Sequence, residues 1–112
     1  MKIEDVDFFY LAMPEILNIG DGSQDTLLVR VRADGLTGWG ECEASPLVSI
    51  ANWVTPMSHS ACRSVRDLVT GQTVDSPHDI TRLGNRVRAG GLDIAQTDHT
   101  FSGLEIALWD LL

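Results

Sequence analysis

Basic residues are scarce in this sequence. Its 112 residues include 8 Lys and Arg against 16 Asp and Glu, which gives a net charge of −8 at pH 7. Nucleic acids and anionic membrane surfaces are bound through basic patches, so the charge balance argues against both as partners. An acidic surface is also what an ordinary soluble protein carries.

Cysteine is nearly absent as well. Cys42 and Cys62 have neither C-x-x-C spacing nor the density of a disulfide scaffold, so we expect reduced thiols and a cytoplasmic protein. Met1 and Lys2 run directly into an acidic segment, which does not predict a signal peptide. No apolar run approaches the roughly 20 residues that a transmembrane helix needs.

Recognisable catalytic motifs are missing too. The three histidines have no second ligand at zinc-like spacing, and neither Gly-x-Gly pair completes a phosphate-binding G-x-G-x-x-G. Glu41 and Glu43 lie on one face of an expected strand, about 7 Å apart. They could bind a cation, or they are simply solvated. The residues alone therefore predict no catalytic set.

The first half of the chain has strand patterns. The length and the 44% hydrophobic content suit a single domain. Alternating apolar residues predict three antiparallel strands, the last two joined by a turn at Asp34-Gly35. Two glycines flank Trp39, which predicts a bulge or a close backbone approach; otherwise Trp39 packs on the hairpin and Glu41 is solvated. The strands are expected at Ile3–Leu11, Thr26–Ala33 and Thr37–Ala44.

Two irregular segments with apolar middles flank this hairpin. Ala12–Gln24 enters the second strand and Ser45–Met57 leaves the third. Successive antiparallel strands bring alternate connections to the same end of a sheet, so we expect these two loops to lie together. Such loops either cover something or bind something.

The second half has helical periodicity. We expect helices over residues 61–69, ended by Gly71, and over 77–90, capped by Ser76. After a polar linker at Leu92–His99, Ser102 and Glu105 form a capping-box pattern that predicts a third helix, and the sequence stops inside this helix at Leu112, without a C-cap. Three strands followed by three helices indicate an α+β fold with helices on one face of a small antiparallel sheet.

The last predicted helix is apolar on nearly all sides, with only Glu105 and Asp110 polar after its first turn. A helix of this kind has to be covered on all sides. Exposing its leucines and its Trp would forfeit on the order of 10 kcal/mol. We therefore expect the sequence to be the front part of a longer protein.

The order of elements and two local phrases resemble a known family. Gly38-Trp39-Gly40-Glu41 and the phrase from Ser102 to Leu111 are similar to the N-terminal capping domain of the enolase superfamily, mandelate racemase/muconate lactonizing enzyme group, over residues 1–112. The resemblance implies a β/α barrel after this chain. That barrel would bind Mg²⁺ through three carboxylates and supply a base that removes a proton α to a carboxylate, giving an enediolate that the metal stabilises.

The resemblance assigns this chain the part of a substrate-specificity lid, built from the two apolar loops. It implies a small carboxylate substrate, with acid sugars favoured because they are common in the group, and a dehydratase, racemase or cycloisomerase activity in a homo-oligomer. Ile16 and Leu47 join the candidate apolar walls, although each loop residue could instead pack within its own loop. The candidate substrate-binding residues are Glu15, Asn18, Ile19, Ser45, Ile50 and Trp53.

One alternative of a different class stays open. The chain could be a free-standing, non-catalytic module that docks onto a partner protein through its apolar C-terminal helix.

Overall fold

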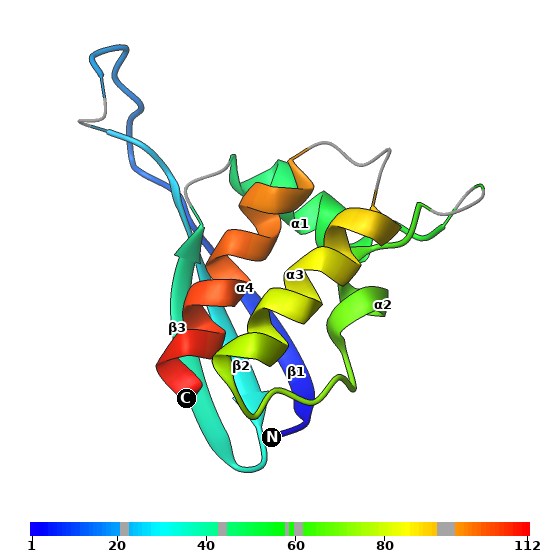
Figure 1. Cartoon of the computed structure of the whole chain (residues 1–112). Coiled ribbons are helices and arrows are strands. Elements are labelled where there is room, and N and C mark those ends of the chain that lie inside the picture. Colours follow the sequence, from blue (N-terminus) through cyan, green and yellow to red (C-terminus); the bar gives the residue numbers. More distant parts are fainter. Residues whose placement is uncertain (21–22, 43–44, 58, 60–61, 92–95) are drawn as a thin grey trace.

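The computed structural model describes residues 1–20, 23–42, 45–57, 59, 62–91 and 96–112. Within these ranges the chain forms a three-stranded antiparallel sheet followed by four helices, which confirms the α+β prediction with one helix more than expected (Figure 1). The elements are β1 (Ile3–Leu11), β2 (Thr26–Ala33), β3 (Leu36–Cys42), α1 (Pro46–Val54), α2 (Val65–Val69), α3 (Pro77–Gly90) and α4 (Thr97–Leu111).

The sheet has the order β1-β2-β3, and the helices cover one of its faces (Figure 1). Asp34 and Gly35 both have positive φ, at 49° and 79°, which is the backbone of a type I′ hairpin turn. The β2–β3 register runs without interruption, so the bulge considered near Trp39 is absent there. A register shift lies instead on β1, between Ile3 and Asp5.

The core lies between the sheet and the helices. On β2 the side chains of Leu27, Val29 and Val31 are buried, while Arg30 and Arg32 lie on the opposite face. That outer face carries ion pairs from these arginines to acidic residues of β1. Alternation of apolar and charged residues along each strand is what creates one helix-covered and one polar face.

Glycines let α4 approach β3 at backbone distance. A Cβ added to Gly38 would lie 2.1 Å from the Ala107 carbonyl oxygen, and one added to Gly40 would lie 2.1 Å from the Gly103 carbonyl oxygen. A Cβ on Gly103 would in turn meet the Cβ of Cys42 at 2.8 Å. The close backbone approach predicted for this strand is therefore confirmed, and the partner is α4.

The segment predicted to be an irregular loop at Ser45–Met57 contains the additional helix, α1. Pro46 occupies its first turn, where the missing N–H has no helical partner in any case. Its buried face includes Ser49, Asn52 and Trp53. Two of those three residues are polar, so the apolar periodicity that normally reveals a helix is missing.

The boundaries of two other helices also differ from the prediction. α2 begins only at Val65, because the Ser64 hydroxyl accepts a hydrogen bond from the N–H of Asp67 and caps the helix there. α4 begins at Thr97, ahead of Ser102. Ser102 lies inside the helix, where its hydroxyl donates to the His99 carbonyl at 2.7 Å, so the capping-box prediction was wrong.

The sheet and the other helices cover α4 on one side. Leu104, Ala107 and Leu108 are at most 1% exposed, whereas Ile106 and Trp109 are each 50% exposed. The described part of the chain therefore buries one side of α4 and leaves an apolar stripe, formed by Ile106 and Trp109, open to solvent. Among the described residues, no helix is long and apolar enough to cross a membrane.

We predict that Gly40→Ala destabilises the fold by roughly 1–3 kcal/mol or more, because a methyl group at this position collides with the α4 backbone. Thr37→Ala on the same strand is the control, since its side chain is exposed. Urea denaturation followed by circular dichroism measures both. Equal midpoints for the two variants would contradict the close-contact interpretation.

Candidate functional site

The two segments predicted to share one sheet end do so. Leu11 pairs with Thr26 at the end of β1, and Leu27 pairs with Cys42 at the end of β3. The start of the β1–β2 loop (residues 12–25) and the end of β3 at Cys42 therefore lie at the same end of the sheet (Figure 1).

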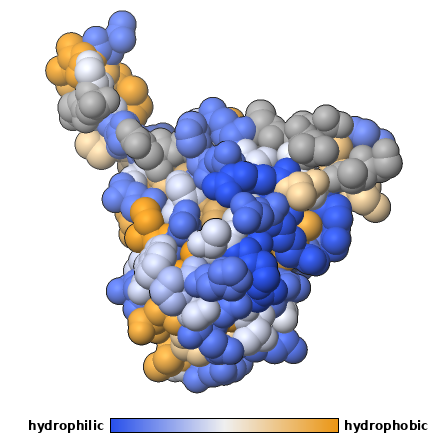
Figure 2. Space-filling model, in the orientation of Figure 1, coloured by the Kyte–Doolittle hydropathy of each residue, from blue (hydrophilic) through white to orange (hydrophobic). Residues whose placement is uncertain are grey.

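The β1–β2 loop projects away from the body of the domain (Figure 1). Hydrophobic residues gather on it, and in the space-filling view it stands clear of the rest of the surface (Figure 2). Ile16 is 57% exposed and Ile19 is 66% exposed. The predicted site residues Glu15 and Asn18 are exposed on the same loop. An apolar projection of this kind is unfavourable in water unless something covers it.

Hydrogen bonds at its neck hold the loop. The Tyr10 hydroxyl donates to one oxygen of Asp25, and the Met13 N–H donates to the other at 2.7 Å. These bonds, the one from Tyr10 first, lower the pKa of the Asp25 carboxyl, and the bond to Asp25 raises the pKa of Tyr10. The ionised Asp25 carboxylate therefore stabilises the folded loop fully above the usual Asp pKa of about 4. This stabilisation is lost as the pH falls through the lowered pKa of Asp25.

On the α1 side, the predicted residues have different surroundings. Ser45 is exposed at the N-cap position, without a side-chain capping bond. Ile50 is half-buried against the core. Trp53 is only 5% exposed, and its ring centroid lies 5.1 Å from that of Phe8. Trp53 therefore belongs to the core in this chain, whereas Ile19 faces solvent.

A buried polar layer fixes α1 to the rest of the domain. The Cys42 thiol donates to the His99 carbonyl at 2.9 Å and lies 3.4 Å from the Ser49 hydroxyl. The Asn52 amide donates to the Thr100 hydroxyl at 3.2 Å. Hydrogen bonds satisfy these buried groups only in one arrangement, so they set the position of α1 against α4 and β3.

An open hollow of about 400 Å³ lies beside the loop neck. Gln24, Glu41, Ser102 and Ile106 line it, from the loop, β3 and α4. Glu41 accepts a hydrogen bond from the Thr26 hydroxyl across the strands. Sequence reasoning missed Gln24, Ser102 and Ile106 as neighbours because they are far apart in the chain. In the β2–β3 register Glu41 pairs with Leu28, so strand pairing gives no signal that would join Glu41 to Gln24.

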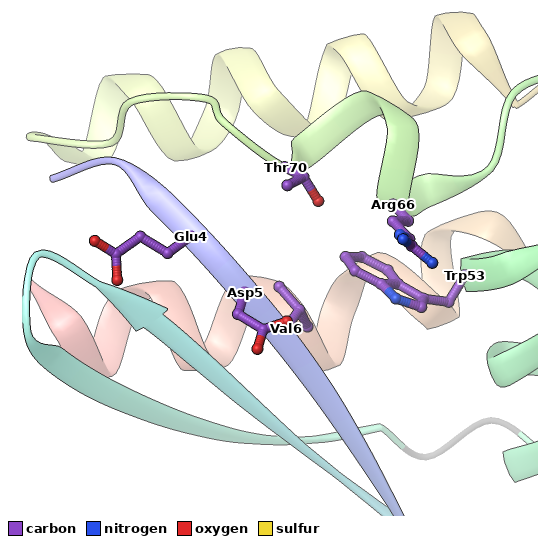
Figure 3. A pocket seen from close by; sticks show the side chains of 6 residues that line it. All are labelled: Glu4, Asp5, Val6, Trp53, Arg66 and Thr70. Atoms are coloured by element: carbon purple, nitrogen blue, oxygen red, sulfur yellow. The ribbon is translucent and has the colours of Figure 1, made fainter.

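A second hollow, of about 290 Å³, lies near the start of β1. Trp53 contributes to it together with Arg66 and Thr70 from the region of α2, while Glu4 points away from the helices (Figure 3). Asp5 and Val6 complete its lining. Val6 pairs with Val31, so this hollow is remote from the loop neck.

No metal site is visible in the described part of the chain, where no group of three or more His, Cys, Asp or Glu residues could hold an ion. His59 lies 3.4 Å from the Cys62 thiol, and this pair is not part of a group of three or more such side chains within the ranges that the structure describes. Glu43, the partner of Glu41 in the cation site considered above, lies outside the described residues. The Mg²⁺ that the family resemblance implies would be bound by the barrel, so these residues do not test it.

Comparison with known proteins agrees with this architecture. Residues 11–112 match the profile of the mandelate racemase/muconate lactonizing enzyme family, N-terminal domain. The chain belongs to this family. A solved structure of a predicted mandelate racemase from Rhodobacter sphaeroides is 57% identical over 99% of this chain, with a TM-score of 0.93. No match to a curated protein reaches significance.

A second solved structure, of a presumed racemase, shares the fold at a TM-score of 0.76 and 21% identity. The chain spans only 28% and 27% of these two proteins.

We predict stability effects of very different size at the two candidate residues Trp53 and Ile19. Trp53→Ala should lower the free energy of unfolding by roughly 3–5 kcal/mol, because it leaves a cavity beside Phe8. Ile19→Ala should change it by less than about 0.5 kcal/mol, because the side chain is exposed. Chemical denaturation of the two variants measures the difference, and a strongly destabilised Ile19→Ala would show that Ile19 packs within its own loop.

Proposed function

We propose that this chain is the substrate-specificity lid of an enzyme that removes a proton α to a carboxylate. The observation that carries the proposal is the exposed apolar β1–β2 loop at one end of a family N-terminal domain. The enzyme's barrel would follow this chain and would contain the base and the carboxylates that bind Mg²⁺. Dehydratase, racemase and cycloisomerase reactions all start from this step, and acid sugars are the favoured substrates.

The lid acts by excluding water. Covering a substrate with Ile16 and Ile19 would remove their side chains from solvent, and full burial of one such side chain contributes roughly 1.5–3 kcal/mol. Because both are already partly buried, the available gain is smaller. The remaining gain still favours a loop that covers the substrate, provided that the substrate offers apolar surface to Ile16 and Ile19. Exclusion of water also lowers the local dielectric and strengthens every charge interaction at the reacting carboxylate.

The polar candidates have a separate role in the proposal. Glu15 and Asn18 lie on the same exposed loop as Ile19, and Ser45 lies at the start of α1. Their oxygen and nitrogen atoms would select hydroxyl groups on a substrate, while the isoleucines select for size. A pocket that pairs substrate hydroxyls discriminates strongly against analogues that lack them.

The open stripe on α4 supports a second part of the proposal. Ile106 and Trp109 are half-exposed on the helix that leads towards the end of this chain, and the relatives are more than three times as long as this segment. We propose that the barrel covers this stripe. If the chain were a non-catalytic docking module, a separate partner protein would bind to the same stripe.

We predict that Ile19→Ala in the full-length enzyme changes substrate selectivity by about 10-fold, since a few methyl groups in an apolar pocket are worth roughly 1–3 kcal/mol. Ratios of kcat/KM across acid sugars, 2-hydroxy acids and cycloalkene carboxylates measure it. Leu36→Ala is the control, because Leu36 is also exposed but lies at the other end of the hairpin. Unchanged selectivity together with lost Mg²⁺ binding would show that this loop is not the lid.

We also predict that Ile106→Ala destabilises the full-length protein more than Leu36→Ala does. The two side chains are 50% and 52% exposed in this chain, but the barrel should bury only Ile106. Removing a side chain from a buried interface costs roughly 2–5 kcal/mol, against less than about 1 kcal/mol at an exposed position. Thermal denaturation of both variants decides; equal effects would leave α4 free for a different partner.

A further inference from the structure

The β1–β2 loop is tied at its neck by a single carboxylate. Tyr10 lies at the end of β1, where it pairs with Leu27, and Asp25 directly precedes β2. Asp25 accepts the Tyr10 hydroxyl with one oxygen and the Met13 N–H with the other, at 2.7 Å. The same side chain therefore fixes both the end of the incoming strand and the first turn of the loop.

A second tie crosses the loop further out. The Leu17 N–H donates to the Ser23 hydroxyl oxygen at 2.5 Å, and the Ser23 hydroxyl lies 3.2 Å from the Leu17 carbonyl oxygen. Ser23 is only 8% exposed although it lies on a projecting loop. The two ties leave the apolar residues Ile16 and Ile19 exposed while restricting the backbone that carries them.

We infer that Tyr10 and Asp25 are positioning residues that set the direction of the β1–β2 loop and thereby the substrate preference of the enzyme. The inference rests on the proposed lid function. Neither residue needs to touch substrate: both act through the loop, whose tip moves further than its neck when the neck rotates. A loop whose direction is already fixed at its neck loses less conformational freedom when substrate binds, which appears as a lower KM.

The charge on Asp25 makes this tie stronger than an ordinary loop hydrogen bond. Bonds to an ionised carboxylate are about twice as strong as those between neutral groups. The two acceptor oxygens are used by two different donors, both on the incoming side of the loop, whereas Asp25 lies on the outgoing side. Removing the tyrosine hydroxyl breaks one of the two bonds across the neck, and removing the carboxylate breaks both.

The test uses the full-length enzyme with Tyr10→Phe and Asp25→Ala. We expect hydrogen exchange of amides in residues 12–20 to increase several-fold in Tyr10→Phe and further in Asp25→Ala. KM for the best substrate of the panel above should increase about 3- to 10-fold in the same order, with a smaller change in kcat. Thr81→Val is the control, because it deletes a hydroxyl that bonds only to the Pro77 carbonyl on α3.

Two results would overturn the inference. Unchanged exchange in Asp25→Ala would mean that the carboxylate does not hold the loop. Faster exchange with unchanged KM and selectivity would mean that the loop direction does not set substrate preference. If Ile19→Ala alters selectivity but Tyr10→Phe does not, only this inference fails; if neither does, the proposed lid function fails as well.

Discussion

The contact between the backbones of α4 and β3 determines where the other elements can lie. Gly38 and Gly40 on the strand and Gly103 on the helix leave no room for a Cβ at their positions in this contact. The helix therefore lies deeper on the sheet than ordinary side chains would permit, and Leu104 and Leu108 reach the centre of the core. Because packed interiors tolerate little added volume, this contact admits a single helix position.

The geometry of the candidate site depends on the contact between α4 and β3. Cys42, at the end of β3, and Thr100, near the start of α4, hold α1 through hydrogen bonds to Ser49 and Asn52. The β1–β2 loop enters the sheet through strands whose register is fixed by the same core. Both apolar segments are thus placed by a rigid scaffold, which is how functional loops are usually presented.

Much of this could be predicted from the sequence. Period-2 patterns gave the strands, and the Ser76-Pro77 pair marked the start of α3. The shared sheet end followed from antiparallel order alone. The prediction failed where local patterns conflict with tertiary packing: buried Ser49 and Asn52 hid α1, and Ser102 with Glu105 imitated a helix start inside α4. Trp53 was predicted to be an apolar loop residue, because its contact with Phe8 depends on α1, which the sequence pattern did not predict. The hollow beside the loop neck joins residues from three elements, which no local pattern reveals.

The paired neck of the β1–β2 loop has an evolutionary consequence. Leu11 and Thr26 face each other as the last strand pair, so the two ends of the loop stay together whatever lies between them. The entropic cost of closing a loop rises only slowly with its length. Insertions, deletions and substitutions beyond the neck can therefore accumulate with little penalty to folding. Loops of different length and composition could therefore be carried by the same sheet and the same core.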